Sequence, residues 1–128
     1  MRILSHGSEG HLDVNTAVDV QFEIWNLRTR KNLNFRLVLL TSENVPVFNT
    51  VSARKPFGVG TITAACHIPA GLLNDEVYHV RLLLVEEGRV LFDQSGVISF
   101  KVEESDRRGP WHGKWLGVVR PVLKWEVK

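Results

Sequence analysis

Alternation of apolar and polar residues along several short segments is the feature of this sequence that most restricts its fold. In the clearest segment, Val18–Trp25, an apolar residue stands at every second position from Val18 to Ile24, with polar residues between them. A side-chain period of two belongs to β-strands, in which one face packs into a core and the other meets solvent. Leu33–Leu40, Val77–Val85 and Val97–Val102 repeat the pattern less strictly. We therefore predict β-strands over these segments.

The composition agrees with strands rather than helices. Eighteen valines, five isoleucines and six threonines carry side chains branched at Cβ, which suit the pleated surface of a sheet. No window shows the periodicity of an amphipathic helix of ordinary length. Short strands divided by glycine, proline and polar turns favour an antiparallel sandwich or barrel. The length allows one domain, residues 1–128.

Tyr78 narrows the choice between these architectures. It lies at the start of its strand, shortly after Leu73–Glu76. This placement resembles the tyrosine corner of immunoglobulin-like sandwiches, in which the phenol caps a nearby backbone group. We therefore predict an all-β chain that forms an immunoglobulin-like antiparallel β-sandwich of about seven or eight strands.

Some segments are predicted to interrupt or border the sheets. Val51–Phe57 is basic and contains a proline, which indicates a loop. Asp93–Gly96 has the composition of a turn and divides a strand over Arg89–Phe92 from one over Val97–Val102. Pro46 indicates that the strand beginning near it lies at a sheet edge, because proline has no N–H to donate.

The C-terminal part of the sequence is separable from the sandwich. A charged connector, Glu103–Pro110, precedes a tail over residues 111–128. In this tail Leu123, Trp125 and Val127 alternate with polar or less apolar residues, which predicts a further strand with Trp125 in a core. A strand that follows a hinge pairs either with its own sandwich or with that of a neighbouring subunit.

Signatures of catalysis are weak. Gly58-Val59-Gly60 lacks the third glycine of a nucleotide-binding loop, and the histidines form no metalloprotease spacing. Cys66 shares a strand face with Ile62 and Ile68, as a buried and inert thiol would. The net charge of +2 does not favour nucleic acid. We predict a non-enzyme that uses no cofactor and no metal.

Trp25 is the first candidate for ligand binding. It lies on the polar face of its strand, in register with Asp19, Gln21 and Glu23. An indole in this position can stack on the apolar C–H face of a sugar ring, while the neighbouring polar groups bind hydroxyls. The alternative is that Trp25 folds under a loop or the tail.

A second candidate surface follows from the expected topology. In an immunoglobulin-like sandwich the strand of Asn34 and Arg36 neighbours the strand of His79 and Arg81. Arginine and asparagine suit multidentate bonds to hydroxyls or to an acidic group such as phosphate. The alternative is an ordinary solvated face. Trp25 is expected on the other sheet, so the two surfaces compete. The predicted carbohydrate-binding residues are Trp25, Asn34, Arg36, His79 and Arg81.

An ordered set of segments resembles a known family. Asp19–Asn26 is a strand that ends in Trp-Asn, Ile68–Leu73 reads IPAGLL before the strand of Tyr78, and Gly117–Pro121 reads GVVRP in the tail. Together these segments resemble the C-terminal domain of the ATP-binding subunit of O-antigen and related polysaccharide ABC exporters, the Wzt C-terminal type. The resemblance extends from Asp13 to Lys128.

The resemblance implies a function and an assembly. It implies a module that binds the exported polysaccharide in the cytoplasm, at the inner face of the inner membrane. The implied partners are the exporter subunits, which the module would reach through an ATPase domain that is absent from this chain. It also implies exchange of the tail strand in a homodimer, with a monomer as the alternative. The alternative function is a dimerisation or interaction sandwich that binds no sugar. The sequence departs from the family at Val77, where a glycine is frequent, and near Met1–Leu4, where the first strand is short or missing.

Overall fold

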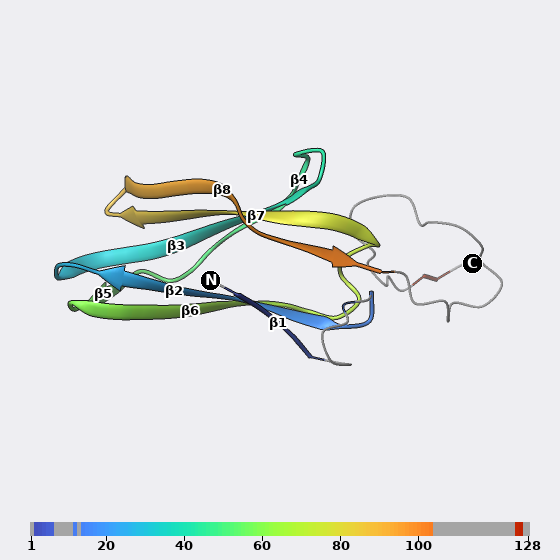
Figure 1. Cartoon of the computed structure of the whole chain (residues 1–128), viewed down its shortest axis with the longest axis horizontal. Coiled ribbons are helices and arrows are strands. Elements are labelled where there is room, and N and C mark those ends of the chain that lie inside the picture. Colours follow the sequence, from blue (N-terminus) through green and yellow to red (C-terminus); the bar gives the residue numbers. More distant parts are fainter. Residues whose placement is uncertain (1, 7–11, 13, 104–124, 127–128) are drawn as a thin grey trace.

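The computed structural model describes residues 2–6, 12, 14–103 and 125–126, and these residues contain eight β-strands and no helix (Figure 1). None of the described residues forms a helix able to cross a membrane. The strands are β1 (Arg2–His6), β2 (Ala17–Asn26), β3 (Arg30–Thr41), β4 (Pro46–Val51), β5 (Lys55–Phe57), β6 (Gly60–Ile68), β7 (Glu76–Glu86) and β8 (Arg89–Val102).

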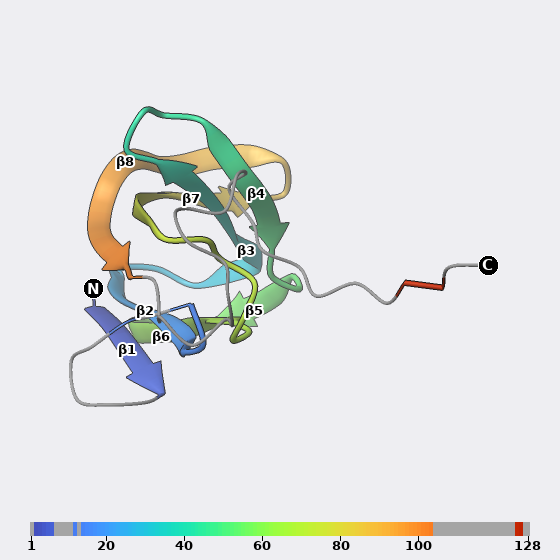
Figure 2. The ribbon, with the colours of Figure 1, turned by 90° about the vertical axis from the view of Figure 1, so that its right-hand side faces the viewer.

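The strands form two layers that face each other across one core (Figures 1 and 2). The smaller sheet has the order β1-β2-β6, and the larger sheet has the order β4-β3-β7-β8 with β5 also paired to β3. Every pairing is antiparallel. This is the immunoglobulin-like sandwich that the sequence predicts, and the edge position of β4 agrees with Pro46.

The apolar positions of the alternating segments build the core. Val20 of β2 and Leu39, Val80 and Leu82 of the larger sheet are fully buried. Across the layers, the rings of Phe22 and Phe35 stack with centroids 6.3 Å apart. Such interdigitation of two inward faces is what fixes the register of each strand, because a slip of one residue would expose every apolar side chain.

Tyr78 forms the predicted corner. Its side chain is fully buried, and its hydroxyl donates to the carbonyl of Asn74 at 2.7 Å. Leu73, which precedes Asn74 in the chain, is buried in the core and closes this end of the sandwich. The corner therefore ties the loop that leads into β7 to the centre of the larger sheet.

Two predicted interruptions are wrong. The segment predicted as a loop over Val51–Phe57 contains β5, because β4 leaves the first part of β3 unpaired and Lys55 and Phe57 bond to it. The turn predicted at Asp93–Gly96 is a bulge within one continuous strand, β8. Gly96 has a φ of 67° there, so the glycine that suggested a turn serves the bulge instead.

The two ends of the chain compare differently with expectation. The strand expected to be short or missing near Met1–Leu4 is present as a short strand of five residues, β1, which pairs with the first half of β2. Trp125, predicted in a core, is 84% exposed and lies in no strand. The described strands of this chain therefore do not cover Trp125, although the alternation in the tail predicts that this side chain is buried. The connector after Glu103 and the rest of the tail lie outside the described residues.

Candidate functional site

The outward face of the larger sheet brings together the predicted residues of β3 and β7. Arg36 lies opposite Leu83, Val38 opposite Arg81, and Leu40 opposite His79. Residues opposite each other in an antiparallel pair share a face, so Arg36 and Arg81 are diagonal neighbours. We call this surface, made by Asn34, Arg36 and Val38 of β3 with His79, Arg81 and Leu83 of β7, the sheet face.

Polar contacts hold two of these side chains in position. Arg81 donates from Nε and Nη2 to the two carboxylate oxygens of Asp93 on β8, at 2.7 and 2.6 Å. The hydrogen bond from Arg81 lowers the pKa of the Asp93 carboxyl, so this carboxylate stays ionised in mild acid. His79 Nε2 is 2.8 Å from Oδ1 of Asn44 in the β3–β4 turn. The sheet face is thus pre-arranged before any ligand arrives.

Asn34 and Arg36 are more enclosed than a polar strand position usually is. Asn34 is only 7% exposed. The Nε of Arg36 is buried and has no hydrogen-bond partner among the described residues. A buried donor without an acceptor is unusual, since it loses the hydrogen bond that water would supply. Arg36 therefore has an unsatisfied donor in the middle of the sheet face, which a ligand oxygen reaches only if the Arg36 side chain moves.

Trp25 lies on the smaller sheet, away from the sheet face. It is 75% exposed, so no loop among the described residues covers it. Most of the tail lies outside the described residues, so the alternative of a covering tail stays untested. On the outward side of this sheet its cross-strand neighbour is Thr61, and Glu23 lies opposite Thr63. The structure thus separates Trp25 from the other four predicted residues, as the expected topology required.

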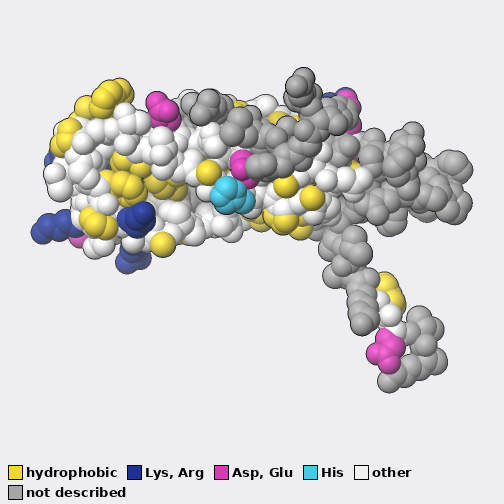
Figure 3. Space-filling view, turned by 90° about the horizontal axis from the view of Figure 1, so that it is seen from below, with side chains coloured by type: hydrophobic (Ala, Val, Ile, Leu, Met, Phe, Trp, Pro, Cys, Tyr) yellow, Lys and Arg dark blue, Asp and Glu magenta, His cyan; other side chains and the backbone are white. Residues whose placement is uncertain are grey.

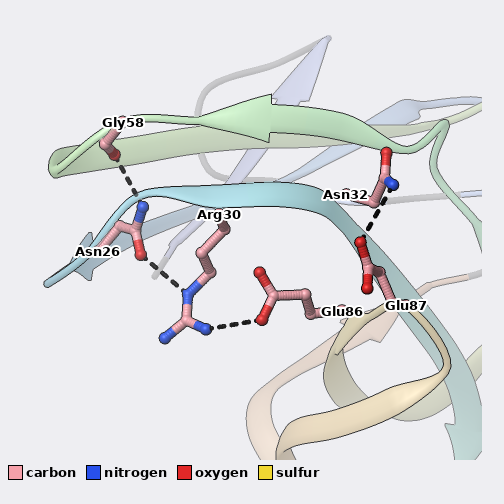
Figure 4. Close-up of polar contacts among 6 residues, drawn as sticks. All are labelled: Asn26, Arg30, Asn32, Gly58, Glu86 and Glu87. Atoms are coloured by element: carbon pink, nitrogen blue, oxygen red, sulfur yellow. Dashed lines mark hydrogen bonds and ion pairs between the residues drawn. The ribbon is translucent and has the colours of Figure 1, made fainter.

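A polar network that sequence reasoning missed braces the strand ends next to Trp25 (Figure 4). The Asn26 amide donates to the carbonyl of Gly58 at 2.7 Å and accepts from Nε of Arg30 at 3.0 Å. Arg30 also donates to Glu86 at 3.1 Å. These contacts join the ends of β2, β3 and β7 to the β5–β6 link. No local signal reveals them, because Arg30 and Glu86 are 56 residues apart.

An apolar cleft opens between the two layers beside this network. Its volume is about 320 Å³, and it lies between β2 of the smaller sheet and β7 and β8 of the larger one. Leu82 and Leu84 form part of its wall, and Trp25, Arg30 and Phe92 also line it. The cleft therefore opens at the edge of the core, with Trp25 from one layer and Phe92 from the other.

A second groove runs between the edge strands β4 and β6 and contains the only cysteine. Burial, and then the charge of Asp19, raises the pKa of the Cys66 thiol, which disfavours the nucleophilic thiolate. His67, beside it, lies 2.6 Å from Asp19 through Nδ1. Among the described residues no cluster of three or more histidine, cysteine or acidic side chains is placed to hold a metal ion.

Comparison with known structures identifies the fold of the chain. The fold is that of an immunoglobulin-like β-sandwich, and the C-terminal domain of Wzt, known from a crystal structure, shares it with a TM-score of 0.79. The two are 14% identical, and the match covers 98% of this chain and 80% of that one. The sequence matches no family model and no curated protein. At this identity the similarity shows the fold, and it confirms the fold that the sequence resemblance implied.

Proposed function

We propose that this chain is a non-catalytic carbohydrate-binding module of a polysaccharide ABC exporter, and that it recognises the glycan to be exported. The observation that carries the proposal is the buried, unpartnered Nε of Arg36 at the centre of the sheet face. The shared fold with the Wzt C-terminal domain and the resemblance of the ordered sequence segments support it.

The chemistry of the sheet face suits a glycan. A hydroxyl or phosphate oxygen that reaches Arg36 satisfies a donor whose isolation costs about 1–3 kcal/mol. Arg81, fixed by Asp93, keeps its other N–H groups for a second oxygen, and Asp93 can accept from sugar hydroxyls. Leu83, opposite Arg36, is only 7% exposed, so the contacts with a glycan come from the polar groups of the sheet face. Arg81 and His79 are already held in place, so recognition mainly requires movement of the Arg36 side chain.

Calorimetry with the polysaccharide of the source organism tests this proposal. The variants Arg36→Ala and Arg81→Ala should each weaken binding at least tenfold, and the double variant should abolish it, with the melting temperature unchanged. Arg28→Ala is the matched control, because Arg28 is an exposed arginine outside the sheet face. Unaltered affinity in the double variant removes the sheet face from consideration. If no glycan binds at all, the alternative of an interaction sandwich stands.

The proposal extends to assembly and location. The resemblance implies a cytoplasmic module at the inner face of the inner membrane, tethered to exporter subunits and dimeric through exchange of the tail strand. The exposure of Trp125 favours exchange, because a tryptophan at an apolar strand position normally needs a surface to cover it. Light scattering at micromolar concentration should give about twice 14.5 kDa. A mass of one chain would leave the tail as an intramolecular strand.

A further inference from the structure

The strand ends next to Trp25 carry apolar side chains that nothing in the described chain covers. Leu27, Trp25 and Val59 are 84%, 75% and 69% exposed. Trp25 is the last residue but one of β2, Leu27 begins the β2–β3 turn, and Val59 lies in the β5–β6 link. The bond from the Asn26 amide to Gly58 holds these segments side by side (Figure 4). We call these three residues the apolar tips.

Exposed basic residues lie at the same end of the sandwich as the apolar tips. The exposed cations of this end are Arg28, Lys31, Lys55 and Arg89. Its exposed acids are Glu23 and Glu87, and Glu87 already accepts from Asn32. Figure 3 shows basic and apolar side chains gathered together at this left-hand end. The end therefore combines an excess of positive charge with apolar side chains that project into solvent.

We propose that this end of the sandwich docks on the surface of an anionic lipid bilayer. Side chains as exposed as Leu27 project beyond the backbone, and a fluid interface accepts such projections without a matching pocket. Tryptophan favours the boundary between headgroups and acyl chains. Lysine and arginine side chains near a bilayer are attracted to anionic headgroups. The braced network beneath the apolar tips keeps them together, so few groups lose freedom on docking.

This surface is separate from the sheet face. The apolar tips lie at the ends of β2 and β5, whereas Arg36 and Arg81 lie on the outward side of the larger sheet. A bilayer at the strand ends leaves that side open to solvent. The proposal therefore does not depend on glycan binding, and each can fail without the other.

Flotation of the full chain with vesicles tests the proposal. We expect the protein to float with vesicles of phosphatidylcholine and phosphatidylglycerol and to stay behind with phosphatidylcholine alone. The double variant Leu27→Ser/Val59→Ser should lower the affinity roughly tenfold or more. Arg28→Gln and Lys31→Gln should each lower it about fivefold, and added salt should weaken binding.

Matched controls lie at the other end of the molecule. Val45→Ser changes an exposed valine in the β3–β4 turn, and Lys101→Gln changes an exposed lysine late in β8. Both should bind anionic vesicles as the unmodified chain does. The proposal is overturned if anionic vesicles do not bind, or if the Leu27/Val59 variant binds them normally. It is also overturned if that variant lowers the mass in solution with no change in flotation, since the apolar tips would then contact a second copy.

Discussion

The sheet face and the apolar tips are both exposed surfaces of one sandwich, but they hold their side chains in opposite ways. On the sheet face, Arg81 is tied to Asp93 and His79 to Asn44, and only Arg36 has a buried atom without a partner. At the strand ends the polar groups are paired beneath the surface, and apolar side chains stand out in water.

This difference indicates two kinds of ligand. A surface of pre-arranged polar groups with one unsatisfied donor gains most from a ligand that supplies acceptors in fixed positions, such as a glycan. A surface of projecting apolar groups with scattered cations gains most from burial and from diffuse negative charge. Variants of the core, the corner and the network therefore show whether the two surfaces bind independently and whether they depend on the same core.

A substitution in the core beneath both surfaces should give the largest effect, a loss of folding stability. Leu82 is fully buried, faces the core from β7 and lines the cleft next to Trp25. Leu82→Ala should lower the free energy of unfolding by about 2–5 kcal/mol, through lost burial and a residual cavity. Urea unfolding measures this, and the exposed control Val59→Ala should stay within about 0.5 kcal/mol. A loss below about 1 kcal/mol would mean that the core is loosely packed beside the cleft.

The corner at Tyr78 should matter for folding and for neither surface. Tyr78→Phe removes the hydroxyl that donates to the Asn74 carbonyl at 2.7 Å and leaves a buried acceptor. We expect a loss of about 1–3 kcal/mol in the free energy of unfolding. Glycan affinity and vesicle flotation of the folded variant should be unchanged. A variant as stable as the parent chain would show that this hydrogen bond contributes nothing to the corner.

A variant of the network under the apolar tips tests directly whether the two surfaces bind independently. Asn26→Ala breaks the bonds to Gly58 and Arg30, so the segments of Leu27 and Val59 are no longer joined. We expect a loss of about 1–2 kcal/mol in stability and weaker vesicle binding. Glycan affinity by calorimetry should not change. An equal fall in both affinities would show that the two surfaces are coupled.

The smallest predicted effect is a change in the titration of one carboxyl in Arg81→Ala, beside the loss of glycan affinity already expected of this variant. The hydrogen bond from Arg81, and secondarily its charge, lowers the pKa of Asp93 in the folded chain. Both side chains are partly exposed, so the pair stabilises the fold little and its loss should leave the melting temperature nearly unchanged. This small stabilisation is present above the ordinary pKa of aspartate and disappears as the pH falls through the lowered one. NMR titration should show the Asp93 pKa rising toward its ordinary value in Arg81→Ala and not in Lys101→Ala. An unchanged value would mean that the bidentate pair does not persist in solution.

The sequence predicted those parts of the fold that depend on local pattern. Alternation located the long strands, and the placement of Tyr78 at the start of its strand predicted its corner. The adjacency of β3 and β7, and hence of Arg36 and Arg81, followed from the expected topology. Period-two patterning succeeds best where a strand buries one face only, as β6 does, and less well in β7, where Leu82–Val85 are all buried.

Features that depend on distant partners were beyond the sequence. The Asn26–Arg30–Glu86 network joins segments whose contact only the folded sheets create. The bulge in β8 uses the same positive φ at Gly96 that a turn would use, so composition does not distinguish the two. The alternation around Trp125 indicates an apolar face and cannot tell which chain covers it. Nor does alternation reveal that Asn34, at an outward position, is buried.

NMR mapping of the glycan on the labelled chain tests most directly the claim that the sheet face binds the polysaccharide. On titration with the source polysaccharide, we expect the largest shifts in the amides around Arg36, His79 and Arg81 and in the Nε–H signal of Arg36. The indole N–H of Trp25 and the amides of Thr61 and Thr63 should not move. Shifts confined to Trp25 and its threonine neighbours would contradict the account and assign the sugar to the smaller sheet.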